Sequence, residues 1–342
     1  MTEGPLVSVI ATCYNHSRFV VECFESIQAQ TYPNIEFIIM DDHSTDGSVE
    51  IIEDWIRTTG VTATFLPSDE NRGICRVRNH ALKHCNGTYL AMVSTDDAWL
   101  PDKLERHVKE MEAQPADVAV LYTDAYRMDE SGAPIPEMFI EPYLPDIHPP
   151  PSGDIYEFLL DGNFIPSLTT LVRRARLVDV GPYDESLSFE DWDMWLRIAQ
   201  RFKFFYHDVP SARYRVVSTS LDHALRGSRR AGLDASKIRI QLKHLGYAPA
   251  FDRLLGWRSL QYARSLYQRE HPRRDEIVGE VAQAGKDHRI RWLSLVATWA
   301  VPHRPVWWLA DKVEQAAERV RPLVSRARRV AGKVFRRARG AP

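Results

Sequence analysis

The chain has 342 residues, 44% of them hydrophobic and 26% charged, a composition typical of globular proteins and unlike that of disordered or collagen-like chains. This length exceeds that of most single cores, so we expect one large domain and an appendage. The four cysteines show no CxxC spacing and no basic, apolar signal precedes the first strand, so we expect reduced thiols and a cytoplasmic location. No apolar run reaches the roughly 20 residues that span a bilayer.

The net charge of −2 conceals an asymmetry. From Arg319 to the end there are eight Arg and one Lys but no acid, so the rest of the chain is acidic. A basic tail favours an anionic surface as its partner, and an acidic body disfavours nucleic acid.

The first half of the chain alternates between short apolar, β-branched runs and stretches with helical periodicity. The predicted elements are a strand at 6–12, a helix at 19–27, a strand at 35–40, a helix at 49–56, a strand at 61–66, a helix at 72–84 and a strand at 88–93. Such alternation predicts an α/β fold with a doubly wound, mostly parallel sheet. The loops that follow its strands then share one edge, and three of these loops carry Asp or Asn.

The second half is less regular. We predict strands at 118–123, 168–172, 202–206 and 212–217 and a helix at 190–201. Residues 134–151 contain seven prolines, which indicates either an extended loop over the sheet edge or a mobile linker. We place the domain boundary after residue 224, so that residues 225–342 form an α-helical C-terminal appendage.

In the stretch 89–101 an apolar run ends in Asp96-Asp97, and a helical pattern begins at Pro101. Two carboxylates at the end of a buried strand lie where open sheets bind ligands, and hard cations such as Mg²⁺ or Mn²⁺ prefer oxygen ligands. The alternative is that Asp97 or Asp102 caps the helix that follows.

Five segments, in order and over about residues 6–220, resemble family 2 glycosyltransferases, the inverting enzymes of GT-A fold, and especially bacterial enzymes of polysaccharide and cell-envelope synthesis. The segments are VSVIATCYNH, FIIMDDHSTDGS, NRGICRVRN, GTYLAMVSTDDAWLPDKL and FEDWDMWLRIA. The resemblance implies a Rossmann-like GT-A sheet and a nucleotide-diphosphate sugar donor, with a UDP-sugar expected first. It further implies Mn²⁺ or Mg²⁺ as cofactor and a hydroxyl of a glycan or lipid-linked acceptor.

The resemblance assigns the donor pocket to several residues. Asp42 would hydrogen-bond the nucleobase, because an ionised carboxylate acts only as an acceptor and therefore suits an N–H group of the base. Thr12 and Tyr14 would line the same pocket. Capping of the helix near Ser48, or a loop Asx-turn, is the structural alternative for Asp42, although Asp46 is better placed to cap.

Further matches extend this pocket. Asn71 and Arg78 would lie beside the donor, Arg78 bonding a carboxylate or the diphosphate unless it is a surface side chain. By the same match Asp96 would contact the ribose or sugar and Asp97 would bind the metal. Thr95 stands where the family usually has another Asp.

Glu190 and Asp191 match the family's acidic pair, in which Asp191 would be the catalytic base. Asp193 is the second candidate for the base. The alternative for Glu190 and Asp191 is that their negative charges only stabilise the N-terminus of the helix. Trp192 and Trp195 indicate either a sugar-stacking platform or core packing. In the family a Tyr-Arg-x-His segment often follows the last strand, but here Val217 occupies the His position, so a third metal or diphosphate ligand is not identified; His223 is a speculative substitute.

The C-terminal residues combine four tryptophans, at positions 292, 299, 307 and 308, with the Arg-rich end. This pattern suits an amphipathic element at a membrane interface, so we expect peripheral association with the inner face of the cell membrane. The alternative is a helical appendage that packs on the main domain.

Two other functions stay open at this point. One is a non-catalytic protein that binds a nucleotide sugar. The other is a sugar-phosphate nucleotidyltransferase, which would need a Gly-rich loop after the first strand that ATCYNHSR does not supply.

Overall fold

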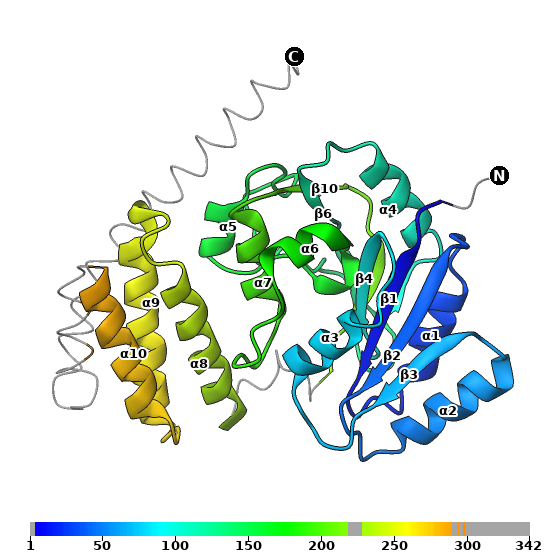
Figure 1. The fold of residues 1–342 in the computed structure, drawn as a ribbon, viewed down its shortest axis with the longest axis horizontal. Coiled ribbons are helices and arrows are strands. Elements are labelled where there is room, and N and C mark those ends of the chain that lie inside the picture. The colour runs from blue at the N-terminus through cyan, green and yellow to red at the C-terminus, as the bar shows by residue number, and fades with distance from the viewer. Residues whose placement is uncertain (1–3, 218–227, 289–292, 294–296, 298–342) are drawn as a thin grey trace. The chain divides into compact units, whose positions relative to one another are not determined.

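The computed structural model describes residues 4–217, 228–288, 293 and 297 (Figure 1). The chain divides into two compact units, Met1–His223 and Ala224–Pro342. In the part that the structure describes, no helix combines the length and apolar character of a membrane span.

A seven-stranded sheet, in the order β10-β6-β9-β4-β1-β2-β3, forms the centre of the first unit (Figure 1). Its strands are β1 (Val7–Cys13), β2 (Ile35–Asp41), β3 (Ala63–Pro67), β4 (Tyr89–Ser94), β6 (Val118–Tyr122), β9 (Leu171–Arg173) and β10 (Lys203–Tyr206). β1 is parallel to β2 and β4, and β3 is parallel to β2, which confirms the predicted mostly parallel sheet. β9 is antiparallel between β4 and β6, and the predicted strand 168–172 instead begins as the 3₁₀ turn η1 (Ser167–Thr169).

Helices cover both faces of this sheet. They are α1 (Val20–Gln28), α2 (Ser48–Thr59), α3 (Ile74–Leu82), α4 (Lys103–Glu112), α5 (Tyr156–Leu160), α6 (Arg174–Val180) and α7 (Asp191–Ala199). Successive strand residues point to opposite faces, and α1, α2 and α4 share a core with one set, including Val9 and Ala91. α3 lies on the other face, where its Arg78 reaches Met92 of β4.

A second, four-stranded sheet in the order β5-β11-β7-β8 lies in the same unit. Its strands are β5 (Ala98–Trp99), β7 (Ala125–Met128), β8 (Pro134–Ile135) and β11 (Ala212–Arg215). β11 pairs antiparallel with β5, directly after the Asp96-Asp97 turn. This pairing brings a distant part of the chain, and Arg215 in particular, to the predicted metal site.

The proline-rich segment 134–151 packs against the first unit. Ile140 and Leu144 are buried, and the Asp124 carboxylate accepts a hydrogen bond from the Ile140 amide at 3.0 Å. The segment is therefore an ordered covering loop, and the mobile-linker alternative was wrong.

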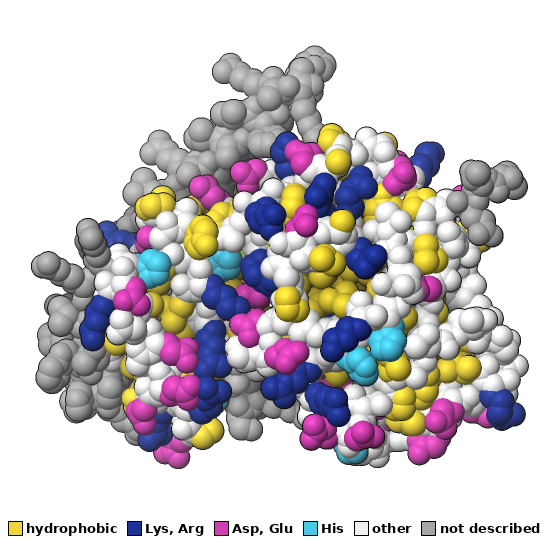
Figure 2. All heavy atoms as spheres, viewed as in Figure 1, with side chains coloured by type: hydrophobic (Ala, Val, Ile, Leu, Met, Phe, Trp, Pro, Cys, Tyr) yellow, Lys and Arg dark blue, Asp and Glu magenta, His cyan; other side chains and the backbone are white. Residues whose placement is uncertain are grey.

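The described part of the second unit contains three helices: α8 (Ser228–Lys243), α9 (Pro249–Gln268) and α10 (Arg274–Asp287). They pack on one another through buried apolar side chains such as Leu255, Leu266 and Val281. Acidic and basic side chains are interspersed over the face of this unit in the left part of Figure 2, and Arg239 pairs with Glu280 at 2.9 Å.

Candidate functional site

The structure gathers the predicted donor and metal residues at one edge of the large sheet. Thr12 lies near the end of β1, Asp42 follows β2, and Asp96 and Asp97 follow β4. The amide of Thr95 donates to the Thr12 carbonyl at 3.1 Å, so the turn after β4 begins beside β1. Because these strands are parallel, their carboxyl ends form a common rim, where ligands bind in folds of this class.

Asp97 is buried and held by the second sheet. Its Oδ1 accepts a hydrogen bond from the backbone amide of Arg215 at 2.8 Å. Burial, and then the neighbouring charge of Asp96, raise the pKa of Asp97 well above its ordinary value. Asp102 occupies the N-cap position of α4, as the capping alternative predicted, but its side chain forms no capping hydrogen bond and pairs with Arg106. Asp97 does not cap the helix, because it accepts the Arg215 amide of β11.

Arg215 braces the Asp96-Asp97 turn. Its buried guanidinium donates from Nε to the Asp96 carbonyl at 2.8 Å and from Nη1 to the Asp129 carbonyl at 3.3 Å, and it pairs with Glu22 of α1. The sequence indicated this position only as part of a Tyr-Arg-x-His segment without its histidine. Arg215 is thus a site residue that sequence reasoning missed, although the motif pointed to its neighbourhood.

The two aspartates fit a hard divalent cation. Oδ1 of Asp96 is buried and has no hydrogen-bond partner among the described residues. His16 Nδ1 lies 3.8 Å from it and is closer to Thr95 Oγ1, at 3.0 Å. A cation here would give Oδ1 of Asp96 a partner. It would also weaken the repulsion between the two carboxylates, which adds to burial in raising the pKa of Asp97.

The rest of such a coordination shell is not supplied by a protein cluster in the described ranges. No set of three or more His, Cys, Asp or Glu side chains there is arranged to hold a metal ion. Mg²⁺ commonly uses one or two carboxylates and completes its shell with water and substrate phosphates, which matches this arrangement. Val217 is a buried apolar residue, and His223 lies outside the described residues.

Asp42 closes the loop that precedes α3. Its two carboxylate oxygens accept hydrogen bonds from the amides of Arg72 at 2.7 Å and Gly73 at 2.9 Å. Burial raises the pKa of Asp42, and the two amide donors oppose this effect. The capping alternative was wrong, because Asp46 bonds the amide of Ser48 at the start of α2.

Thr12, Tyr14 and Asn71 are the other residues predicted to contact the donor beside Asp42. Oγ1 of Thr12 is buried without a hydrogen-bond partner in the described part of the chain, Tyr14 is 40% exposed, and the Asn71 amide donates to the Asp42 carbonyl at 3.2 Å. Each carboxylate oxygen has two lone pairs, so Asp42 keeps acceptor capacity beyond its loop contacts. Asp42 is thus able to accept a further hydrogen bond, and the Tyr14 ring is accessible for contact.

Arg78 is buried and forms an ion pair with Glu190 at 3.0 Å. Burial is the largest influence and lowers the pKa of its guanidinium, but Glu190, Tyr183 and Asp191 together raise this pKa above its ordinary value, so the arginine stays charged. The surface alternative was therefore wrong. The contact joins α3 to the start of α7, and of the two partners expected for Arg78 it is the carboxylate that the structure shows.

Asp191, the predicted base, is the first residue of α7. Its Oδ2 accepts a hydrogen bond from Asn163 Nδ2 at 2.7 Å, and its Oδ1 accepts one from the Trp192 amide at 2.7 Å. Asp193 is more deeply buried and bonds Arg197 at 2.9 Å. This ion pair makes Asp193 a weaker candidate for the base than Asp191.

Trp192 and Trp195 are core residues. Trp192 is buried and donates from Nε1 to the Leu159 carbonyl at 2.7 Å, while Trp195 packs edge-to-face on Phe204 with ring centroids 6.3 Å apart. The core-packing alternative is confirmed, and a sugar-stacking platform at these two positions is wrong.

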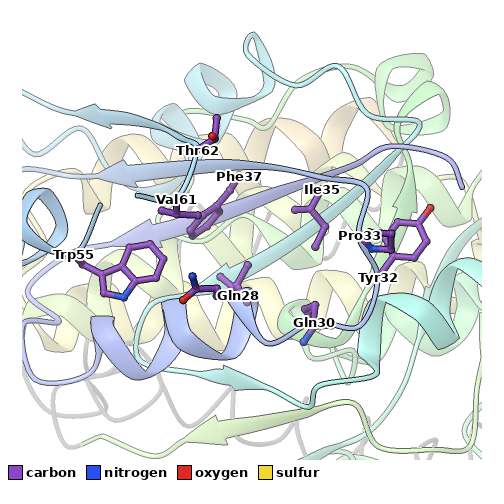
Figure 3. Close-up of a pocket in the computed structure, with 10 residues that line it drawn as sticks. Gln28, Gln30, Tyr32, Pro33, Ile35, Phe37, Trp55, Val61 and Thr62 are labelled. Carbon is purple, nitrogen blue, oxygen red and sulfur yellow. The ribbon is translucent and has the colours of Figure 1, made fainter. Parts of the chain in front are cut away.

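A cavity of about 250 Å³ lies away from this rim, where β2 begins and α1 ends (Figure 3). Ile27, Phe37 and Trp55 line it together with Gln28, and no carboxylate, histidine or cysteine is among its lining residues. It therefore lacks the chemistry of the candidate site, which remains at the carboxyl ends of the strands.

Comparison with known proteins connects this geometry to a family. The model of the family described as glycosyl transferase family 2 matches residues 8–177. Over 219 residues the chain is 29% identical to TuaG of Bacillus subtilis, which is named provisionally as a glycosyltransferase of teichuronic acid biosynthesis; the match covers 64% of this chain and 81% of TuaG.

Two solved structures share the fold. TarS of S. aureus in complex with UDP superposes with a TM-score of 0.58 at 17% identity, covering 92% of this chain and 91% of that one. The mannosyltransferase PcManGT from Pyrobaculum calidifontis, in complex with GDP-Man and Mn²⁺, gives a TM-score of 0.54 at 20% identity, covering 92% of this chain and 85% of that one. Both likenesses concern the fold, and they confirm the predicted GT-A architecture.

Proposed function

The chain belongs to glycosyl transferase family 2 and is a glycosyltransferase, and from this premise we propose that it transfers a sugar from a nucleotide-diphosphate sugar, first of all a UDP-sugar, to a hydroxyl group with inversion. The proposed acceptor is a glycan or lipid-linked saccharide of polysaccharide or cell-envelope synthesis, the kind of process for which TuaG is named. One observation carries the proposal: the buried Asp96-Asp97 pair at the strand ends, with its unpartnered oxygen.

In this proposal the donor lies along the rim of the sheet. Asp42 accepts a hydrogen bond from the base, with Thr12, Tyr14 and Asn71 beside it. Asp97 would hold Mn²⁺ or Mg²⁺, while Asp96 contacts the ribose or sugar. When bound, such a cation supplies positive charge that stabilises the departing diphosphate.

The transfer is a single displacement. The acceptor oxygen attacks the anomeric carbon from the side opposite the diphosphate, and Asp191 accepts the hydroxyl proton. The bond from the anomeric carbon to the phosphate oxygen breaks, its electron pair leaves with the nucleoside diphosphate, and the configuration inverts. General-base assistance of this kind contributes about 10²–10⁴-fold.

Glu190 has a different part in this scheme from the one expected of an acidic pair. Its carboxylate forms an ion pair with Arg78, so we propose that Glu190 holds the start of α7 in position. Asp191 alone then acts as the base.

Release of nucleoside diphosphate from UDP-, GDP- and dTDP-sugars tests the proposal, with water as the acceptor and with Mn²⁺ present or absent. We expect one nucleotide to be released, and Asp191→Asn to slow the release by at least about 100-fold without weakening donor binding. Binding without release in the wild type would favour the non-catalytic alternative. Release that persists in Asp191→Asn would remove the base assignment.

We also propose peripheral membrane attachment through the C-terminal residues, which lie outside the described residues. The support is the sequence: four tryptophans and an Arg-rich end are typical of interfacial segments. A chain truncated after residue 290 should no longer sediment with vesicles containing phosphatidylglycerol, whereas the full chain should. Equal sedimentation of both proteins would contradict this attachment.

A further inference from the structure

A loop residue that no motif indicated contacts the proposed base. Asn163 lies between α5 and η1, and its Nδ2 donates to Asp191 Oδ2 at 2.7 Å. At its other end, Asn163 Oδ1 accepts a hydrogen bond from the Ile165 amide at 3.1 Å. Because the backbone N–H can only donate, the amide oxygen must face Ile165, and the NH₂ group must face Asp191.

The loop and the helix are joined at a second point. Trp192, next to Asp191, donates from its buried ring to the Leu159 carbonyl at 2.7 Å. Two hydrogen bonds thus connect 159–163 to the first two residues of α7. The distance between the Asn163 amide and the Asp191 carboxylate is therefore determined by contacts of the loop and by contacts of the helix.

The two oxygens of Asp191 have distinct donors. Oδ2 meets Asn163, and Oδ1 meets the Trp192 amide at 2.7 Å. Donors on both oxygens fix the plane of the carboxylate and stabilise its ionised form, which is the form that accepts a proton.

We propose that Asn163 is the positioning residue of the catalytic base: its amide orients the Asp191 carboxylate and keeps it ionised for the acceptor hydroxyl. This inference rests on the proposed function, since it takes Asp191 as the base. Asn163 acts through Asp191 and is not itself a catalytic residue.

Other charged groups also surround Asp191, and they set the background for any pH effect. Charged or titratable groups occur on α7 and on each element that contacts it. They are Glu190, Asp193 and Arg197 at α7, Arg78 of α3, Tyr156, Glu157 and Asp161 at α5, Arg174, Arg176 and Asp179 of α6, and Lys203 and Tyr206 of β10. A change confined to residue 163 leaves them all in place, so a shift in the pH profile reports the contact of Asn163 with Asp191.

The variant Asn163→Asp separates positioning from a structural role. An aspartate has the same shape and still accepts the Ile165 N–H, so the loop keeps its internal hydrogen bond. When ionised it cannot donate to Asp191, and two carboxylates at this distance disfavour a second charge, so one of the pair holds a proton to higher pH. The matched control is Gln200→Glu, which makes the same amide-to-carboxylate change at the other end of α7, where Gln200 donates to the Tyr156 hydroxyl.

The experiment follows UDP release from UDP-N-acetylglucosamine and UDP-glucose between pH 5 and 9. For Asn163→Asp we expect the acid limb of the kcat profile to move up by about one pH unit or more and kcat at pH 7 to fall about ten- to hundredfold, with KM unchanged. Gln200→Glu should retain the wild-type limb. A limb in Asn163→Asp that coincides with the wild type would overturn the inference.

Two further measurements keep the outcomes distinct. If Asp191→Asn is inactive while Asn163→Asp is normal, only the role of Asn163 fails; if Asp191→Asn is as active as the wild type, the base assignment fails and the role of Asn163 with it. If neither sugar nucleotide is turned over, the ¹³C NMR titration of the Asp191 carboxyl carbon, identified by its loss in Asp191→Asn, decides the question. Its midpoint should rise in Asn163→Asp, and an unchanged midpoint would contradict the inference.

Discussion

Glu190 and Asp191 are neighbours in the chain, yet their carboxylates have different surroundings. Glu190 meets the buried guanidinium of Arg78, whereas Asp191 meets neutral N–H donors. A carboxylate paired with a buried cation contributes to stability, because removing the carboxylate leaves the cation buried without a countercharge. Adjacent acids thus take separate tasks according to the elements that face them.

The residue-scale prediction concerns this ion pair. In Glu190→Gln the buried Arg78 loses its countercharge, so we expect the free energy of unfolding to fall by about 3 kcal/mol. Removing both charges, in Arg78→Met with Glu190→Gln, should recover most of this loss. Urea denaturation followed by tryptophan fluorescence measures both.

The control for this prediction is Asp54→Asn, which breaks the exposed pair of Asp54 with Arg57. Its effect should stay below about 1 kcal/mol. A double variant no more stable than Glu190→Gln would show that the unpaired charge is not the cause.

The sequence predicted those site residues that belong to a recognisable motif. Asp42, Asp96 and Asp97 follow apolar strands, so their place on the rim was predictable. Arg215 and Asn163 were not, because the contacts they make join segments more than 25 residues apart and depend on short strands and loops without periodicity.

At the scale of elements, α4 contains buried charge that faces the core. Lys103 is fully buried, with Nζ 4.2 Å from the centroid of the Trp99 ring and 3.3 Å from the Thr170 carbonyl. Burial, and then the charge of Arg106, lower the pKa of Lys103 to about 7. Burial also lowers the pKa of His107, one turn later on the same helix.

The element-scale prediction follows from the sign of this shift. The folded protein releases the Lys103 proton near pH 7, whereas the ordinary pKa is 10.5, so the unfolded chain binds more protons between these values and stability rises with pH there. The penalty is complete below pH 7 and absent above pH 10.5. Lys103→Met should therefore raise the free energy of unfolding by about 1–4 kcal/mol at pH 6 and by clearly less at pH 9.5.

Urea denaturation at the two pH values checks the prediction for Lys103. An equal gain at both would mean that Met improves packing and that the buried ammonium carries no penalty. A loss of stability at pH 6 would show that the contacts with Trp99 and Thr170 outweigh its desolvation.

Elements with strong periodicity were predictable, and short ones were not. The parallel strands and the helices α1 to α4 follow from apolar runs and helical spacing. β5, β7 and β8 have two to four residues each and exist through pairing with β11 and its neighbours, a tertiary effect that local sequence does not encode.

At the scale of the whole molecule, every residue assigned to the candidate site lies in the first unit. The rim residues, Asp191 and Asn163 all lie within Met1–His223. Composition and the order of motifs predicted this concentration of function in the first 220 residues. The acceptor was not predictable, since no motif in the sequence identifies residues that would recognise it.

The most direct test of the proposed function is donor binding by isothermal titration calorimetry. UDP-, GDP- and dTDP-sugars are titrated with and without Mn²⁺ into the wild type and into Asp97→Asn. The asparagine still accepts the Arg215 amide through its side-chain oxygen, so the turn is retained while the negative charge is lost.

We expect one nucleotide to bind in a manner that requires Mn²⁺, and we expect the Asn variant to bind it at least about tenfold more weakly because hard cations need the carboxylate. Binding that is equally tight without Mn²⁺, or unchanged in Asp97→Asn, would contradict the assignment of Asp97 as the metal ligand.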